Sequence, residues 1–297
     1  MEHAIIVHSP DYANWVFDPS HPTQGRRFLH GRNQIMLEAQ RRHLNVDEYE
    51  PEMPHTDDLL LIHDPVYIHD VTIRGESNEW GGQRHDLGDL AKLFVGGTLT
   101  ALNLLLEGKT KLAIHLPGAK HHAMYDYSSG FCVFNDLAIA STKATLAGHK
   151  VAIFDCDAHH GDGTEELLRS NQNVLTFSVH QYGIFPGTGL VSNFDEWALN
   201  FPLVAGTGNE GLEFATDSFL EAAVVFEPTL IFIACGADAL DNDLLSELNY
   251  TVGGYSSAMR RIRETFPHTP ILFGGAGGYL PDTGTPAVWS EASLALI

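Results

Sequence analysis

The sequence has few basic residues, few cysteines and no long uninterrupted apolar segment. Its 17 Lys and Arg residues stand against 38 Asp and Glu, which gives a net charge of −21 at pH 7 with histidine neutral. A surface of that sign repels phosphate groups, so we expect no nucleic-acid partner. Three cysteines, all in apolar surroundings, are an odd number and favour buried, reduced thiols in a cytoplasmic protein.

The same scarcity of long apolar segments excludes a membrane-spanning protein, since no stretch is expected to reach the length of a membrane span. The first residues, MEHAIIVHS, lack the basic-then-apolar layout of a signal peptide. A hydrophobic content of 44% in 297 residues is enough for a full core, and no linker or internal repeat divides the chain. We therefore predict a single domain over residues 1–297.

Apolar runs of strand length alternate with segments of helical periodicity along the chain. The predicted strands are 4–8, 111–115, 151–155, 174–179, 199–203, 230–235 and 271–274, and the predicted helices are 90–106, 135–146, 212–226 and 254–266. This alternation predicts an α/β fold with a mostly parallel central sheet and helices on both faces. The Gly-, Pro- and Asn-containing segments 11–25 and 74–86 are expected to form the mouth of a site above the sheet.

The most informative segment is FDCDAHHGDG, residues 154–163, which directly follows an apolar run. Ligand sites of open α/β sheets lie at the carboxyl ends of the strands, so this segment is expected at such a site. Asp157 and His159 lie two residues apart, point to the same side of an extended backbone and are able to share a metal ion. The alternative is that these acids cap the next helix, which for Asp162 alone is the favoured interpretation.

Three further strand ends and a tandem histidine pair carry polar chemistry. His180 ends one strand, Asp238 follows another in CGAD, Tyr279 ends the glycine-rich turn GGAGGY, and His121 and His122 follow the strand 111–115. Taken singly, each has an ordinary structural explanation, such as a helix cap for the aspartate or a core position for the tyrosine. Because parallel strands place all their carboxyl ends at one edge, their joint occurrence predicts a metal site there.

The residue types at this edge select the chemistry. Two carboxylates and one histidine leave open positions on a zinc-like ion, which is typical of a catalytic site, and the chain has no CxxC pair for a closed one. The tandem histidines are suited to proton transfer when each contacts a carboxylate such as Asp155 or Asp162, and Tyr279 is suited to donate a hydrogen bond to an oxyanion. Together these groups predict hydrolysis of an amide or ester.

The motifs GAKHHA, SGFCVFND, DCDAHHGDG, SVH…FPGTG, CGAD and GGAGGY in combination resemble those of the zinc-dependent deacetylases, over nearly the whole chain. This superfamily comprises histone deacetylases, acetoin-utilisation proteins and acetylpolyamine amidohydrolases, and the chain looks most similar to bacterial acetoin-utilisation and class I types. The resemblance implies an arginase-like α/β fold, one catalytic zinc ion, for which iron(II) or cobalt are alternatives, and a structural potassium ion.

The resemblance also implies roles for individual residues. Zinc ligands fall on Asp157, His159 and Asp238, the general base and acid on His122, and the water-orienting partner on His121. Asp155 and Asp162 are implied to lie behind His121 and His122, respectively, and Tyr279 at the substrate carbonyl. Arg27 is implied to lie in an internal cavity. The implied ligands of the potassium ion are Asp155, Asp157, His159, Ser178 and Val179.

The substrate tunnel is implied to lie between Gly130, Phe131 and Phe185, with Asp86 as the candidate for the acid that grips the substrate at the rim. Polyamine-selective relatives place a glutamate at the tunnel mouth, where this chain has Leu245. The sequence therefore offers a second ammonium group no carboxylate partner at position 245. It favours an acetylated lysine peptide or protein, or another small acetylated amine, as the substrate.

Other functions stay open at this point. An acetylpolyamine deacetylase suits the negative charge, and Glu247 lies near the mouth position. A binuclear ureohydrolase would need further carboxylates, and a non-catalytic binder of acylated ligands would be expected to lack a ligand or a catalytic group that this chain retains. The sequence is compatible with a homo-oligomer and does not name the physiological substrate or acyl length.

Overall fold

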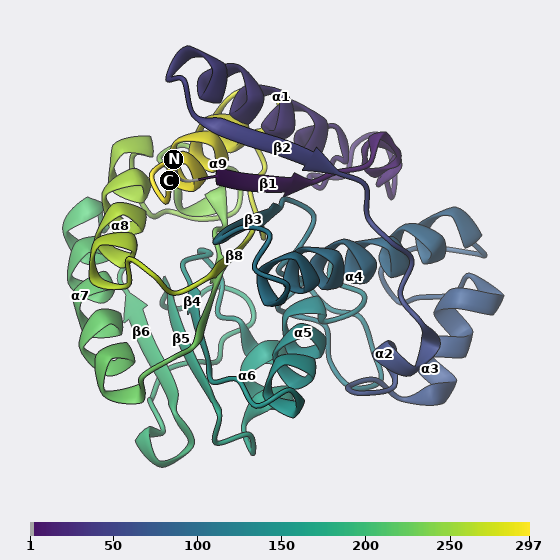
Figure 1. The fold of residues 1–297 in the computed structure, drawn as a ribbon. Helices are drawn as coiled ribbons and strands as arrows, with labels where there is room; N and C mark the ends of the chain where they lie inside the picture. Colours follow the sequence, from purple (N-terminus) through teal and green to yellow (C-terminus); the bar gives the residue numbers. More distant parts are fainter. Residues whose placement is uncertain (1–2) are drawn as a thin grey trace.

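The fold is organised around an eight-stranded sheet in which every strand pairs in parallel with its neighbours (Figure 1). The structure, a computed structural model, describes residues 3–297. The strand order is β2-β1-β3-β8-β7-β4-β5-β6, with bounds β1 His3–Val7, β2 Asn45–Tyr49, β3 Leu112–His115, β4 Val151–Asp155, β5 Val174–Gln181, β6 Ala198–Leu203, β7 Leu230–Ala234 and β8 Ile271–Gly274. The predicted α/β class with its parallel sheet is confirmed.

Helices cover both faces of this sheet (Figure 1). On one face α7, α8, α9 and α1 pack in succession, and on the other α4, α5 and α6 do so. Their bounds are α1 Arg26–Arg41, α4 His85–Leu106, α5 Asp136–Leu146, α6 Asp162–Leu168, α7 Asn209–Phe226, α8 Val252–Thr265 and α9 Gly284–Leu294. Shorter elements are α2 Thr56–Leu59, α3 Pro65–His69, the π-turn Asp70–Arg74, and the 3₁₀ turns Pro10–Asn14, Phe194–Glu196 and Ala237–Ala239.

The four central strands are buried along their whole length, as expected for a parallel sheet covered on both sides. Every residue of β3, β4, β7 and β8 is buried. Phe154 of β4 packs with Phe177 of β5 and Phe219 of α7, with ring centroids 6.0 and 4.9 Å away. Each fully buried large apolar side chain contributes about 1.5–3 kcal/mol relative to exposure. This packing holds the carboxyl ends of the inner strands in fixed positions.

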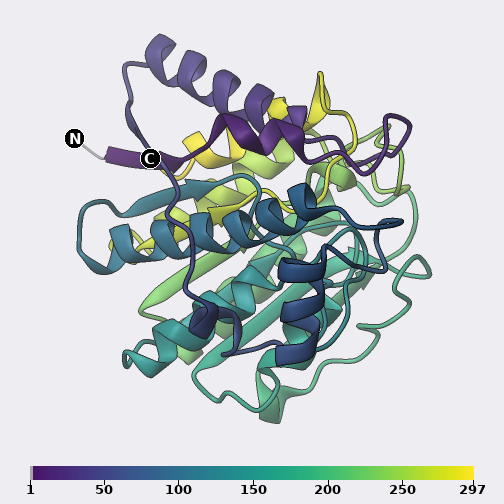
Figure 2. The ribbon, with the colours of Figure 1, turned by 90° about the vertical axis from the view of Figure 1, so that its right-hand side faces the viewer.

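Helix α4 corrects one expectation from the sequence. Its 22 residues are long and apolar enough to cross a membrane by length and composition alone, with a mean hydropathy of 1.3 over the best window. That window is 67% buried inside the protein, and α4 packs against β1, β3 and β8 across the face seen in Figure 2. The apolar character of α4 therefore matches a core helix that needs no lipid.

His63 links the segment after α2 to the start of α5. Its Nδ1 lies 3.2 Å from the carbonyl oxygen of Tyr125, and its Nε2 accepts a hydrogen bond of 2.9 Å from the backbone N–H of Asn135. Because Nε2 accepts a hydrogen bond, the imidazole is neutral, with its proton on Nδ1 and directed at the Tyr125 carbonyl. Burial lowers the pKa of His63 to about 4.

The low pKa of His63 predicts a loss of stability in mild acid. The unfolded chain takes up a proton near pH 6.5 and the folded chain only near 4, so stability contributed by the neutral imidazole is present above 6.5 and is lost as the pH falls. We expect His63 to account for about 2 kcal/mol of the fall in unfolding free energy between pH 7 and pH 5. Urea unfolding of wild type and His63→Gln at both values measures it. An equal fall in the two proteins would contradict the assignment.

Candidate metal and catalytic site

Three ligand-type side chains meet at the carboxyl edge of the sheet. Asp157 and His159 lie in the turn after β4, and Asp238 lies in the 3₁₀ turn after the neighbouring strand β7. One ligand atom from each lies within 4.8 Å of the others, and all three residues are buried. His159 Nδ1 is 3.1 Å from Asp157 Oδ1 and 2.9 Å from Asp238 Oδ2. These residues form a candidate metal triad.

Backbone groups hold the two carboxylates of this triad. The N–H of Ala158 donates to Asp238 Oδ1 at 2.9 Å, and the N–H of Gly277 donates to Asp157 Oδ2 at 2.7 Å. A Cβ at position 277 would lie 2.4 Å from Asp238 Oδ2 and 2.6 Å from Asp157 Oδ2, so the turn after β8 needs glycine there. The glycine-rich motif therefore allows the backbone to approach the ligands closely.

The electrostatics of the triad fit a divalent cation. Burial, together with the charge of Asp157, raises the pKa of Asp238 to about 7. Burial on its own would lower the pKa of His159, but the two carboxylates raise it to about 11. Within residues 3–297 no Lys or Arg forms an ion pair with either carboxylate. Two buried carboxylates and one imidazole are a donor set that zinc, iron(II) and cobalt accept.

Two histidines beside the triad each contact a carboxylate through Nδ1. His121 Nδ1 lies 2.6 Å from Asp155 Oδ2, and His122 Nδ1 lies 2.7 Å from Asp162 Oδ1. Their ring centroids are 4.0 Å apart. A carboxylate at Nδ1 fixes the ring orientation and leaves Nε2 to exchange protons with a substrate or water.

The two histidines differ in charge because their surroundings differ. Burial opposes the charge on His121, but Asp155 and Asp157 outweigh it and raise the pKa of His121 to about 9. Burial and the adjacent positive charge of His121 lower the pKa of His122 to about 4. At neutral pH the pair therefore holds one cation and one free base, the separation that acid–base chemistry needs.

Tyr279 follows β8 and faces the same region. Its backbone N–H donates to Asp243 Oδ2 at 2.8 Å, and its ring meets Phe131 edge-on with centroids 6.0 Å apart. Burial raises the pKa of Tyr279, so the phenol keeps its proton and stays a hydrogen-bond donor.

A pocket of about 370 Å³ opens above these groups. It is lined by Glu79, His122, Gly130, Phe131, His159, Ile184, Phe185, Leu245 and Tyr279. The four predicted tunnel residues, Gly130, Phe131, Phe185 and Leu245, therefore lie together around one opening. Gly130 has a φ of +53°, and a Cβ there would lie 2.4 Å from the His122 ring, so glycine lets the wall approach the histidine.

Asp86 is not brought to this pocket. It lies in the first turn of α4, is largely exposed and forms an ion pair of 2.7 Å with Arg84. The acid that lines the pocket is Glu79, whose pKa is raised by burial. Glu79 is thus a carboxylate of the pocket wall that the sequence analysis did not single out, beside the predicted Leu245. The only signal for Glu79 was its place in the segment 74–86, which was predicted to form the mouth.

Three of the residues predicted at the potassium site lie on the paired strands β4 and β5, and Asp157 and His159 lie in the turn after β4. Asp155 of β4 is the register partner of Ser178 of β5, and Val179 follows it, fully buried. Ser178 Oγ also lies 2.9 Å from His180 Nδ1. Arg27, predicted in an internal cavity, is buried and donates from Nη1 to the carbonyl oxygen of Gly278 at 2.7 Å.

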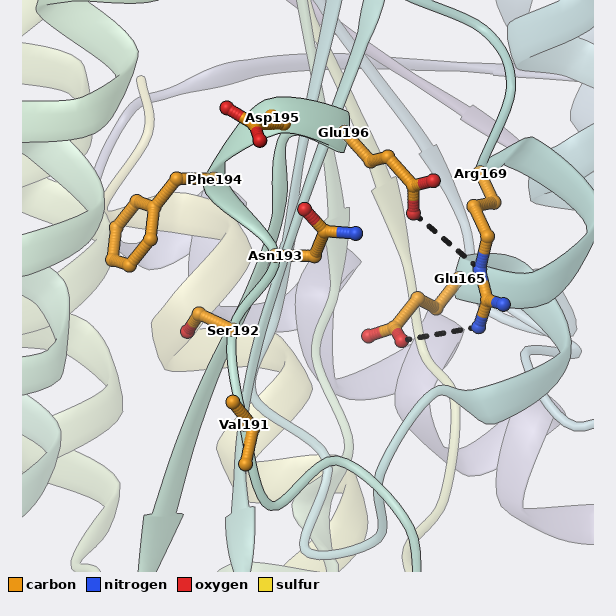
Figure 3. Close-up of a pocket in the computed structure, with 8 residues that line it drawn as sticks. All are labelled: Glu165, Arg169, Val191, Ser192, Asn193, Phe194, Asp195 and Glu196. Atoms are coloured by element: carbon orange, nitrogen blue, oxygen red, sulfur yellow. Dashed lines mark ion pairs between the residues drawn. The ribbon is translucent and has the colours of Figure 1, made fainter.

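A larger hollow of about 700 Å³ lies elsewhere, along the segment 191–196 (Figure 3). Arg169 points toward two of its carboxylates, at 4.0 Å from Glu165 and 3.7 Å from Glu196. None of its lining residues is a histidine or a member of the triad. We therefore place the candidate site at the sheet edge.

The fold has a counterpart among solved structures. It is similar to a solved structure described as "Crystal Structure of HDA15 HD domain", with a TM-score of 0.87 over all of this chain and 90% of that chain. At 22% sequence identity this likeness shows the arginase/deacetylase-like fold alone.

Comparison of sequences then gives the family. The family model of the histone deacetylase domain matches residues 21–295, and the chain belongs to this family. It is 30% identical to acetoin utilization protein AcuC of Bacillus subtilis, covering 99% of this chain and 82% of that protein. It is 31% identical to histone deacetylase 8 of Xenopus laevis, covering 79% and 78%, respectively.

Proposed function

We propose that this protein is a metal-dependent deacetylase, a single catalytic domain that hydrolyses N-acetyl or other N-acyl groups from lysine-like amines. The observation that carries the proposal is the histidine pair beside the triad, with its two Nδ1–carboxylate contacts and its opposite pKa shifts. The names of the relatives, which include histone deacetylases, support an acetylated amine as the substrate class.

Asp157, His159 and Asp238 would hold the catalytic ion, for which zinc is our first candidate and iron(II) or cobalt are alternatives. When bound, such an ion supplies Lewis acidity toward a water molecule and the acyl carbonyl. A structural potassium ion would be held at Asp155, Ser178 and Val179, with further ligands from the turn after β4.

The chain's own residues then divide the proton transfers. His122, neutral at Nε2, accepts a proton from the attacking water and later delivers one to the leaving amine, while Asp162 holds its ring. His121, cationic against Asp155, stabilises negative charge near the acyl carbon. The hydroxyl of Tyr279 donates to the oxygen that becomes negative in the transition state.

The pocket walls favour an aliphatic stem. Phe131 and Phe185 contribute apolar ring surface, and Phe185 stands edge-on to His122 with centroids 5.0 Å apart. A methylene chain passes such walls easily, whereas an unpaired ammonium halfway along would lose its hydration. The acylated end of a lysine side chain fits this requirement.

A second candidate is acetylpolyamine deacetylation, and Glu79 is the specific observation that favours it. A half-buried carboxylate at the pocket gives a second ammonium group a partner that Leu245 does not. Kinetics on acetyl-lysine peptides, acetylpolyamines and longer acyl-lysines, with metal content measured on the same protein, distinguish the two. A non-catalytic acyl-ligand binder would bind these compounds and hydrolyse none.

Leu245 provides a substitution that shifts this preference. We expect Leu245→Glu to raise the ratio of kcat/KM on acetylspermidine to kcat/KM on an acetyl-lysine peptide roughly five-fold. This corresponds to about 1 kcal/mol, because the new carboxylate attracts the distal ammonium. Leu245→Gln, similar in size but uncharged, is the matched control. If both variants change the ratio equally, the charge at this position has no part in selection.

The cytoplasmic location, the absence of nucleic-acid and membrane partners, and a homo-oligomeric state stay predictions from the sequence. Gel filtration measures the oligomeric state, fractionation of cells that express the protein measures its location and membrane association, and gel-shift assays with DNA and RNA measure nucleic-acid binding.

A further inference from the structure

The hydroxyl of Tyr279 takes its position from the backbone that carries it. Within residues 3–297 this hydroxyl has no hydrogen-bond partner, whereas the backbone N–H of the same residue donates to Asp243. The ring is contacted edge-on by Phe131, with centroids 6.0 Å apart, and by the guanidinium of Arg27, 5.8 Å from the ring centroid. No directional contact holds the phenol oxygen itself, so its place follows from the turn before it.

The peptide group between Gly278 and Tyr279 is held at both ends. Its carbonyl oxygen accepts a hydrogen bond of 2.7 Å from Arg27 Nη1, and its N–H donates one of 2.8 Å to Asp243 Oδ2. Gly278 has a φ of +133°, a conformation that glycine adopts freely because it has no Cβ. A glycine at this point lets the peptide group rotate unless both ends are held. The contact with Asp243 is therefore needed to fix the direction in which Tyr279 leaves the turn.

Asp243 is itself placed by neighbouring parts of the site. It follows the 3₁₀ turn that carries Asp238, and its backbone N–H donates to the carbonyl oxygen of Leu240 at 3.0 Å. Its Oδ1 accepts from the backbone N–H of Leu245 at 3.3 Å. One carboxyl group thus joins the backbone of Tyr279 to the turn of a proposed metal ligand and to a residue of the pocket wall.

The surroundings of Asp243 are unusual for a residue that only stabilises the fold. It is buried, and within residues 3–297 no lysine, arginine or histidine forms an ion pair with it. A buried carboxyl group without a cation costs stability that backbone hydrogen bonds offset only in part. Departures of this kind occur mainly at functional sites.

We propose that Asp243 is a positioning residue that holds the hydroxyl of Tyr279 where the acyl oxygen gains negative charge. This inference rests on the proposed function. Asp243 lies outside the lining of the acyl pocket and acts through the peptide N–H of Tyr279. A donor to an oxyanion has to lie about 2.7–3.1 Å from that oxygen, so a displacement of about 1 Å removes most of its effect.

The first experiment is a double-mutant cycle in the metal-loaded enzyme, with Asp243→Ala, Tyr279→Phe and the two combined. The readout is kcat per bound metal ion on a saturating acetyl-lysine peptide, because a change at the Leu245 wall acts on KM. We expect Asp243→Ala to lower kcat by about 10–100-fold when the hydroxyl is present. In Tyr279→Phe the same change should cost less than about three-fold, because no hydroxyl is left to position.

Two results of this cycle overturn the proposal. One is an unchanged kcat in Asp243→Ala, and the other is an equal fall in both backgrounds, which would mean that Asp243 acts without the hydroxyl. Asp241→Ala, at an exposed acid two residues earlier, is the matched control and should leave kcat near wild type.

Asp243→Asn tests whether the acceptor can be restored. Its amide oxygen can still accept from the N–H of Tyr279, but without the charge, so we expect a smaller fall in kcat of about 3–10-fold. If Asp243→Ala does not fold, Asp243→Asn takes its place in the cycle, and an equal effect in both backgrounds again contradicts the proposal.

Amide hydrogen exchange tests the contact without turnover. The peptide that contains Tyr279 should exchange faster in the Asp243 variants than in wild type, while exchange in α4 stays the same. Unchanged exchange at Tyr279 overturns the positioning role. Failure of wild type to hydrolyse any acyl-lysine would overturn the proposed function, and exchange at Tyr279 would then decide on its own whether Asp243 positions this residue.

Discussion

Replacement of His122 by alanine is expected to lower turnover by about 10²–10⁴-fold, and replacement of Tyr279 by phenylalanine by about 10²–10³-fold. His122 is the neutral member of the histidine pair, so its loss removes the base that accepts the proton from water. Tyr279→Phe removes a single hydroxyl that burial keeps protonated, and leaves the ring packed against Phe131. Steady-state kinetics on an acetyl-lysine peptide measure both effects.

The melting temperature distinguishes a catalytic role of His122 and Tyr279 from a role in core packing alone. We expect both variants to melt near wild type and to keep their metal, because the contacts of the triad do not pass through either side chain. A lowered melting temperature together with near-normal turnover per folded molecule would mean that these residues only fill the core.

The second large effect is expected from Asp238→Ala, which should lose the bound divalent ion and with it the activity. Asp238 supplies one of the three clustered ligand atoms, and its other oxygen accepts from the N–H of Ala158. Removal leaves two ligands, too few for tight zinc binding in a site that also keeps open positions. Elemental analysis of the purified protein gives the metal-to-protein ratio, which we expect to fall from about one to a small fraction.

Asp241→Ala is the matched control, since this aspartate lies three residues further along and is exposed. It should keep both the ion and the activity. Full metal content and full turnover in Asp238→Ala would show that the ion is bound elsewhere.

Much of the site was predictable because its chemistry follows directly on buried strands. The apolar run of β4 fixes where FDCDAHHGDG begins, and the parallel arrangement brings the ends of β7 and β8 to the same edge. Strand β2 was not predicted, because this edge strand, NVDEY, is mostly exposed and has no apolar run. Helices α1 and α9 were also missed, and only the packing of α1 on α9 and of α9 on α8 explains which of their faces are apolar.

The residues that sequence reasoning missed at the site share a different cause. Glu79 lies in a loop segment whose course depends on the rest of the fold, so its place in the pocket wall has no local signal. Lys120 is part of a recognised motif, but a lysine in a sequence is ordinarily a surface residue. Its burial between Phe28 and Phe94 is a property of the assembled structure alone.

The strand order has a consequence for how the protein is made. Strands β7 and β8 lie between β3 and β4 in the sheet, although in the sequence they come after β4, β5 and β6. Until the ribosome has released them, the histidine pair after β3 and the aspartates after β4 belong to two separate groups of strands. Such long-range pairing is slow to form. The candidate metal triad therefore comes together only after β7 has been synthesised and has paired with β4, and the histidine pair joins it only after β8 has paired with β3.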